Sequence, residues 1–101
     1  MQPQLAIDRR VIEEFCRRHY IRKLALFGSV LREDFRPDSD VDVLVEFAPE
    51  HGPGLLRLYQ IEEELRPLLG GHRPDLVTFK ALNRWIRDRV LAEAQVQYAE
   101  G

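Results

Sequence analysis

The sequence of 101 residues contains one cysteine, Cys16, and no long apolar run. A single cysteine excludes a disulfide framework and a cysteine-based zinc site within one chain. A stretch of about eighteen apolar residues, which a membrane span needs, is missing, and so is a charged and then apolar leader. We therefore expect a protein that neither spans a membrane nor is exported, with the cytoplasm as its compartment.

A strong charge of either sign is also lacking, because 15 lysines and arginines stand against 17 aspartates and glutamates, for a formal net charge of −2. A dedicated nucleic-acid-binding domain is normally basic, so we expect no direct binding of nucleic acid. The 45% content of hydrophobic residues argues against disorder and predicts a single folded domain over residues 1–101. A domain of this length has a thin core and no room for a second catalytic lobe.

Hydrophobic spacing predicts helices that alternate with strands. Apolar residues recur at helical intervals near both ends and in the middle of the chain, whereas shorter apolar or alternating runs indicate strands. Pro67 is expected to disturb the last turn of the middle helix. The predicted order is helix 8–20, strand 21–27, strand 41–47, helix 55–69, strand 74–79 and a final helix from residue 82 to near residue 98. This alternation favours the α/β (α+β) fold class, with helices packed on a small β-sheet.

One cluster of residues stands out: Gly28-Ser29, ten further residues, and then Asp40-Val41-Asp42 at the start of an apolar strand. Residues i and i+2 of a strand project from the same face, so the carboxylates of Asp40 and Asp42 repel each other unless a cation lies between them. Mg²⁺ prefers oxygen ligands and is usually held by one or two carboxylates together with substrate phosphates. The pair therefore predicts a Mg²⁺ site.

The turn at Gly28-Ser29 supplies the phosphate side of such a site. A strand that ends at a glycine, followed by a short helix that opens at a serine, presents backbone N–H groups and a hydroxyl to an anion. Arg32 and Arg36 could reach phosphate oxygens as well, although solvated charge is an equal interpretation for Arg36. Asp75, near the start of the third strand, is the candidate third carboxylate, which would bind metal and accept the proton of an acceptor hydroxyl.

The segment GSVLREDFRPDSDVDVLVEF resembles the signature of the DNA polymerase β-like nucleotidyltransferase superfamily, and specifically its minimal nucleotidyltransferases, the small partners encoded beside HEPN toxins. The final segment, WIRDRVLAEAQVQYAE, resembles the C-terminal helix of that family. The resemblance implies a small mixed sheet with helices on one side, a polymerase β palm-like fold, Mg²⁺ as the metal, and ATP as the donor of AMP with release of pyrophosphate. It assigns the glycine-serine turn to Gly28 and Ser29 and the three acids to Asp40, Asp42 and Asp75. Glu33 departs from the pattern, because many members have glycine there.

Three functions are compatible with this resemblance. The favoured one is an antitoxin that transfers AMP from ATP to a tyrosine hydroxyl of a partner HEPN toxin. The alternatives are a non-catalytic antitoxin that binds and masks its toxin, and a small-molecule (aminoglycoside-type) nucleotidyltransferase whose acceptor site forms between two copies.

The final helix is a candidate contact surface. Its apolar stripe is flanked by arginines, and aromatic and arginine residues are favoured anchors of protein interfaces. The stripe contains Trp85, Ile86, Val90 and Leu91, and the arginines are Arg84, Arg87 and Arg89. The sequence therefore predicts association with the toxin, or with a second copy as a homodimer, through this helix or through the residues beyond Ala94.

Overall fold

The computed structural model describes residues 5–100, in which helices alternate with the strands of one sheet. The elements are α1 (Arg9–Arg18), β1 (Ile21–Phe27), the 3₁₀ turn η1 (Gly28–Leu31), β2 (Val41–Phe47), α2 (Leu55–Leu65), the 3₁₀ turn η2 (Arg66–Leu69), β3 (Pro74–Thr78), the 3₁₀ turn η3 (Phe79–Ala81), α3 (Arg84–Glu93) and β4 (Gln95–Ala99). The strand order is β3-β2-β1-β4. β1 runs antiparallel to both of its neighbours, whereas β2 and β3 are parallel. The predicted mixed sheet with packed helices is confirmed.

Helix α1 begins at a polar cap and ends at a sharp reversal. The carboxylate of Asp8 accepts hydrogen bonds from the backbone N–H groups of Arg10, at 3.0 Å, and Val11, at 3.4 Å. This arrangement satisfies donors that the first turn of a helix leaves free. The chain leaves the helix at His19, and Tyr20 adopts a positive φ of 58° before β1 begins.

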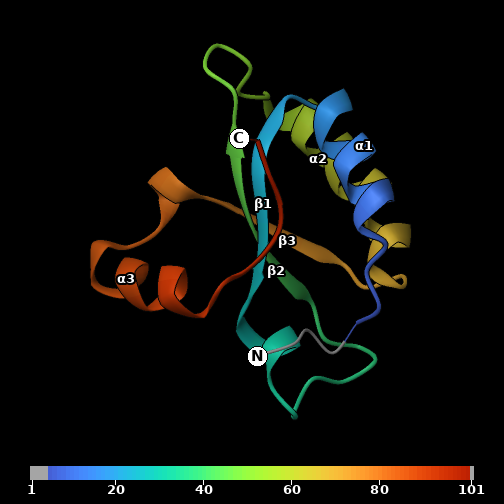
Figure 1. Ribbon diagram of the computed structural model, residues 1–101, viewed down its shortest axis with the longest axis vertical. Helices are drawn as coiled ribbons and strands as arrows, with labels where there is room; N and C mark the ends of the chain where they lie inside the picture. The colour runs from blue at the N-terminus through green and yellow to red at the C-terminus, as the bar shows by residue number, and fades with distance from the viewer. Residues whose placement is uncertain (1–4, 101) are drawn as a thin grey trace.

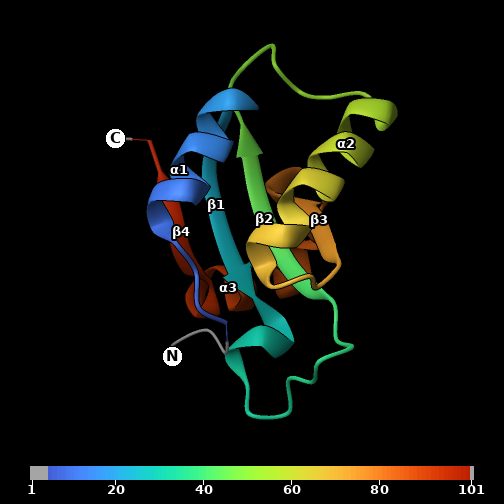
Figure 2. The same cartoon turned by 90° about the vertical axis from the view of Figure 1, so that its right-hand side faces the viewer.

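One face of the sheet is covered by α1 and α2, which stand in front of it in Figure 2. Alternate residues of β1 and β2 point to this side and meet the apolar stripes of both helices. Each such side chain contributes roughly 1.5–3 kcal/mol by leaving water. The cluster consists of Ile12, Phe15, Cys16, Ile21, Leu24, Leu26, Val30, Leu31, Val41, Val43, Val45, Ile61, Leu65 and Leu69. Burial raises the pKa of the Cys16 thiol to about 12, as expected for a core residue.

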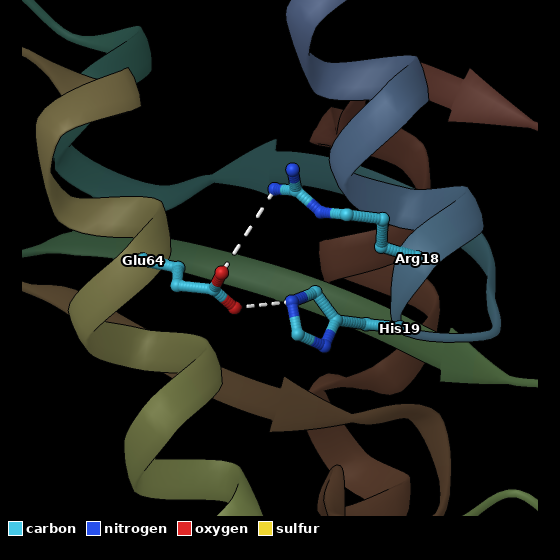
Figure 3. A network of polar contacts seen from close by, with 3 residues as sticks. All are labelled: Arg18, His19 and Glu64. Atoms are coloured by element: carbon cyan, nitrogen blue, oxygen red, sulfur yellow. Dashed lines mark ion pairs between the residues drawn. The ribbon is translucent and has the colours of Figure 1, made fainter.

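A polar contact joins the two helices beside this core (Figure 3). The Nε2 atom of His19, at the C-terminal end of α1, contacts a carboxylate oxygen of Glu64 on α2. The guanidinium of Arg18 lies 4.0 Å from the other carboxylate oxygen of Glu64. His19, at the C-cap of α1, therefore links this helix to its neighbour α2.

The opposite face of the sheet is covered by α3 and the segment just before it; α3 lies away from α1 and α2 in Figure 1. Leu82 and Val90 pack on Ala25 of β1 and Leu44 of β2. The expectation of helices on one side of the sheet is therefore wrong. β2 carries a second, smaller apolar contact at Leu44, and this contact binds α3 to the far face.

The last helix is shorter than predicted. The chain turns at Ala94, which has a ψ of 136°, and Gln95–Ala99 then forms β4 instead of continuing the helix. β4 pairs with β1, with Tyr98 opposite Leu24 and Val96 opposite Ala25. The resemblance of this segment to a C-terminal helix is thus correct for α3 and wrong for the strand. A truncation that removes residues 95–101 would take a strand from the sheet. It would therefore not test whether the residues beyond Ala94 bind a partner, because the fold would change as well.

Two other boundaries also differ by a few residues. Helix α2 ends at Leu65, and Pro67 lies in the first turn of η2, which confirms that the proline interrupts the helix. β3 ends at Thr78, whose hydroxyl oxygen accepts a hydrogen bond from the N–H of Ala81 at 3.2 Å and so caps η3. No helix within residues 5–100 has the length and apolar character that crossing a membrane requires.

Candidate active site

The turn after β1 is built around Gly28. This residue has a positive φ of 77°, which an L side chain rarely adopts, and it starts η1 directly after the strand. Its neighbour Phe27 is paired with Asp42 across β1 and β2. A Cβ atom at Gly28 would collide with carboxylate oxygen Oδ2 of Asp42. Glycine is required here for two reasons, the backbone conformation and the close approach of a carboxylate.

The parallel pairing of β2 and β3 brings the second and third acids together. Asp42 and Asp75 are direct partners in the register, so their side chains are neighbours, and the charge of Asp75 acts on Asp42. Asp40 lies just before β2, is exposed, and is close enough to act electrostatically on Asp42. The structure therefore brings together the three carboxylates that the sequence singled out, with Asp42 at the centre.

This crowding changes the protonation of Asp42. Burial raises the pKa of the Asp42 carboxyl above its ordinary value, and the negative charges of Asp75 and Asp40 raise it further. The guanidinium of Arg32 acts in the opposite direction. Arg32 also lies 3.6 Å from a carboxylate oxygen of Glu93, at the end of α3. The site holds more negative charge than its own residues balance, so it favours a proton or a cation.

The residues present fit a Mg²⁺ ion that is shared with a substrate. Within residues 5–100, no three Asp, Glu, His or Cys side chains are arranged to hold a metal ion by themselves. Mg²⁺ commonly takes one or two carboxylates from the protein and completes its shell with waters and substrate phosphates. The adjacent carboxylates of Asp42 and Asp75, beside the open backbone of Gly28, have this character.

Comparison with known proteins supports the same chemistry. Residues 8–96 match the family described as the nucleotidyltransferase domain. A solved structure described as a minimal nucleotidyltransferase is 38% identical, with a TM-score of 0.69, and the similarity covers 86% of each chain. The chain belongs to the minimal nucleotidyltransferase family. The protein adenylyltransferase MntA of Thermococcus cleftensis is 42% identical over 81 residues, which cover 80% of this chain and 79% of that protein.

More distant solved structures share the fold of this minimal nucleotidyltransferase. A toxin–antitoxin complex with AMP-PNP is 18% identical, with a TM-score of 0.70 over 92% of this chain and 74% of that one. A complex of a tri-AMPylated Shewanella oneidensis HEPN toxin with its MNT antitoxin is 17% identical, with a TM-score of 0.62 over 90% and 69% of the two chains. At these identities the likeness shows the fold.

The other predicted residues of the nucleotidyltransferase site lie in η1 and the loop after it. Ser29 is half-buried, and its backbone carbonyl accepts a hydrogen bond from the N–H of Arg32 at 2.9 Å. Arg36 is exposed, and its backbone N–H donates to the hydroxyl oxygen of Ser39 at 3.0 Å. Arg32, and not Arg36, is the arginine that acts on Asp42. The structure therefore places Arg32 at the acids and leaves the predicted phosphate role of Arg36 as a prediction.

Glu33, which stands where many family members have glycine, fits the loop without strain. Within residues 5–100 the non-glycine residues with positive φ are Tyr20 and Glu50, so Glu33 does not adopt the left-handed conformation. The loop therefore turns after η1 without the glycine.

Two residues near the site were missed from the sequence. The Nδ1 atom of His72 lies 2.9 Å from the backbone carbonyl of Ser39, and its ring packs 4.7 Å from that of Phe35. His72 is half-buried, and its contact with Ser39 holds the segment that leads into Asp40. Glu93, the partner of Arg32, is the other. Both contacts join residues far apart in the chain, and no local pattern signals them.

Proposed function

We propose that this minimal nucleotidyltransferase transfers AMP from ATP to a protein hydroxyl, with a tyrosine of a HEPN-family toxin as the acceptor. The observation that carries the proposal is the Asp42–Asp75 pair directly beside the Gly28 turn, which offers a carboxylate site for metal next to open backbone. The relatives add support: MntA of Thermococcus cleftensis is named a protein adenylyltransferase, and the related complexes contain AMP-PNP or an AMPylated HEPN toxin.

The residues of the site divide into two groups. Asp42 and Asp75, with Asp40 beside them, would hold Mg²⁺ together with waters and substrate phosphates, and the ion would neutralise phosphate charge and orient the α-phosphate for displacement. The backbone of Gly28 and Ser29, together with the guanidinium of Arg32, would bind the phosphates of ATP. The raised pKa of Asp42 means that magnesium and nucleotide bind more tightly as that carboxyl loses its proton.

The transfer is a displacement at the α-phosphorus. The acceptor oxygen forms a new bond to this phosphorus while the bond to the bridging oxygen of the β-phosphate breaks. Pyrophosphate leaves with the electron pair of the broken bond, and AMP becomes esterified to the acceptor. Asp75 accepts the proton of the hydroxyl, a role that suits a carboxylate held beside a second one. Arg32 offsets the negative charge on the phosphates.

The decisive experiment uses ATP labelled in the α-phosphate, Mg²⁺ and a HEPN-family toxin from the same organism. The proposal expects label on that protein, and none when its acceptor tyrosine is replaced by phenylalanine. The double variant Asp40→Asn with Asp42→Asn should transfer nothing and lose Mg²⁺–ATP affinity in calorimetry. A matched control, Asp34→Asn with Asp38→Asn, removes the same charge from exposed loop positions and should behave as wild type.

Each alternative has its own result in this assay. A stable complex that carries no label indicates an antitoxin that acts by binding alone. Label on a small hydroxyl compound, but not on the protein, indicates a small-molecule transferase. Unchanged Mg²⁺–ATP affinity in the Asp40 and Asp42 double variant contradicts the assignment of the metal site.

A further inference from the structure

Helix α3 leaves most of its apolar stripe in solvent. Val90 packs on the sheet, but Trp85 is 82% exposed and Ile86 is 45% exposed. Arginines border these side chains: the guanidinium of Arg84 lies 5.4 Å from the centre of the Trp85 ring. An exposed tryptophan among arginines has the composition of a protein-binding site more than that of a solvated helix face.

A groove that includes Leu91 of α3 lies over the C-terminal half of β2. Its volume is about 720 Å³, and it lies between Leu44 and Phe47 of β2, Phe79 of η3 and Leu91 of α3. Phe79 is 39% exposed, and the guanidinium of Arg87 covers its ring at 4.9 Å. We call Phe79, Trp85, Ile86 and Leu91, together with this groove, the α3 surface.

The charge of the α3 surface is opposite to that of the chain as a whole. The groove lining and α3 together contain six basic and four acidic side chains, and one of the four, Glu93, pairs with Arg32. The whole chain carries a net charge of −2. Helix α2 has the reverse balance, with one arginine and three glutamates. A partner with acidic residues around an apolar patch would therefore be steered to α3.

The position of the surface relative to the acids matters more than its composition. Asp42 and Leu44 project from the same face of β2, about 7 Å apart, and Val90 of α3 packs beside Leu44. Trp85 and Glu93 are about 12 Å apart along α3, and Glu93 contacts Arg32, which acts on Asp42. A protein seated on α3 is thus adjacent to the site of transfer.

A second exposed apolar patch provides the contrast. Leu55, Leu56 and Tyr59 are exposed on α2, which packs on the other face of the sheet. A partner bound there would have the sheet between its hydroxyl and the acids. Apolar exposure alone does not distinguish the two patches, but position and charge do.

We infer that the α3 surface is the docking site for the protein that carries the acceptor hydroxyl, through an acidic and apolar segment of that protein. The inference rests on the proposed function, and it adds where the acceptor is held. Binding at α3 places the acceptor beside Asp42 and Arg32 without contributing to nucleotide binding, so its loss should affect the acceptor and not ATP.

The test compares exposed residues on the two faces. Trp85→Ala should raise the KM for the HEPN-family partner about tenfold or more, which corresponds to the loss of one interface anchor, with little change in kcat or in ATP affinity. Arg89→Glu should weaken association less, with an effect that shrinks as salt is added. The matched control, Leu56→Ala on α2, should leave all of these values within about twofold of wild type.

Binding in the absence of ATP separates the two proposals. If wild type transfers no AMP, the proposed function fails, and calorimetry with the unmodified partner still tests docking through Trp85. An acceptor KM in Trp85→Ala equal to that of wild type overturns the inference, as does an equal loss in Leu56→Ala. RNA is the alternative ligand of a basic surface. If Trp85→Ala loses binding to a single-stranded RNA probe while its acceptor KM is unchanged, the inference is also overturned. If Trp85→Ala unfolds, Ile86→Lys replaces it.

Discussion

The two faces of the sheet differ in what they bury. The face under α1 and α2 encloses fourteen buried hydrophobic residues, whereas the face under α3 has a cluster of four. The second face carries Asp42 and Lys23, which are half-buried, and Glu46, which is exposed, so charged side chains are accommodated there. The two faces therefore have different roles. The face under α1 and α2 stabilises the fold, and this stability allows the face under α3 to hold carboxylates that repel each other.

The sharpest test of this division is truncation of one core residue on each face. Phe15→Ala, in the α1 and α2 cluster, should cost about 3–5 kcal/mol of unfolding free energy because it leaves a large cavity. Val90→Ala, under α3, removes two methyl groups from a small cluster and should cost about 1–2 kcal/mol. Urea unfolding measures both values. Equal losses would show that the α3 face is as important for stability as the other.

Asp75→Asn tests the chemical face directly. The variant keeps the shape of the side chain but cannot accept a proton, so the transfer rate should fall by roughly 10²-fold or more while nucleotide affinity changes much less. Asp34→Asn, at an exposed position of the loop after η1, is the control and should transfer normally. Single-turnover kinetics and calorimetry separate the two effects, and a wild-type rate in Asp75→Asn would remove this residue from the site.

Gly28→Ala tests the contact between the turn and the acids. The added Cβ collides with Asp42 and also requires a positive φ, so we expect transfer to fall by about 10²-fold through displacement of the carboxylate. Gly71→Ala provides the match, because Gly71 has a φ of 88° and no atom within 4 Å of an added Cβ. It should lose stability from the backbone but retain transfer. Similar activities of the two variants would indicate that the contact with Asp42 is unimportant.

The smallest expected effect concerns pH. Burial and neighbouring acids raise the pKa of Asp42 in the folded protein, so between the ordinary value of 3.8 and the raised one the folded state holds more protons than the unfolded state. The unfolding free energy of wild type should therefore fall as pH rises through this window. The Asp42→Asn variant has no carboxyl at this position and does not lose unfolding free energy in this way. Without Mg²⁺, the difference in unfolding free energy between the variant and wild type should therefore favour the variant more at pH 7 than below pH 4. Denaturant titrations at both pH values measure the difference, and a constant difference would contradict the raised pKa.

Strands with a clear apolar or alternating pattern were predicted from the sequence with the boundaries that the structure shows. β1 and β2 occupy the residues that their apolar runs indicate, and the three acids meet because the strand registers allow it. The C-terminal strand was not predicted, because its five residues follow a helical pattern and their pairing depends on β1, far away in the chain. The side on which α3 packs was missed for a related reason: Leu44 is a single apolar residue on the polar side of its strand. Contacts such as His72 with Ser39 depend on the assembled fold.

The pairing of β4 with β1 has a consequence for how the molecule is made. Roughly seventy residues separate the two strands, so their pairing is a long-range contact that requires a large loop to close. Helix α3 lies between β3 and β4 in the chain, and its position over Leu44 depends on both. During synthesis the α1 and β1 segments emerge well before their last partner, with one edge of β1 open to other chains. The open edge of β1 is therefore covered only after β4 has been synthesised, and until then it can pair with a strand of another chain.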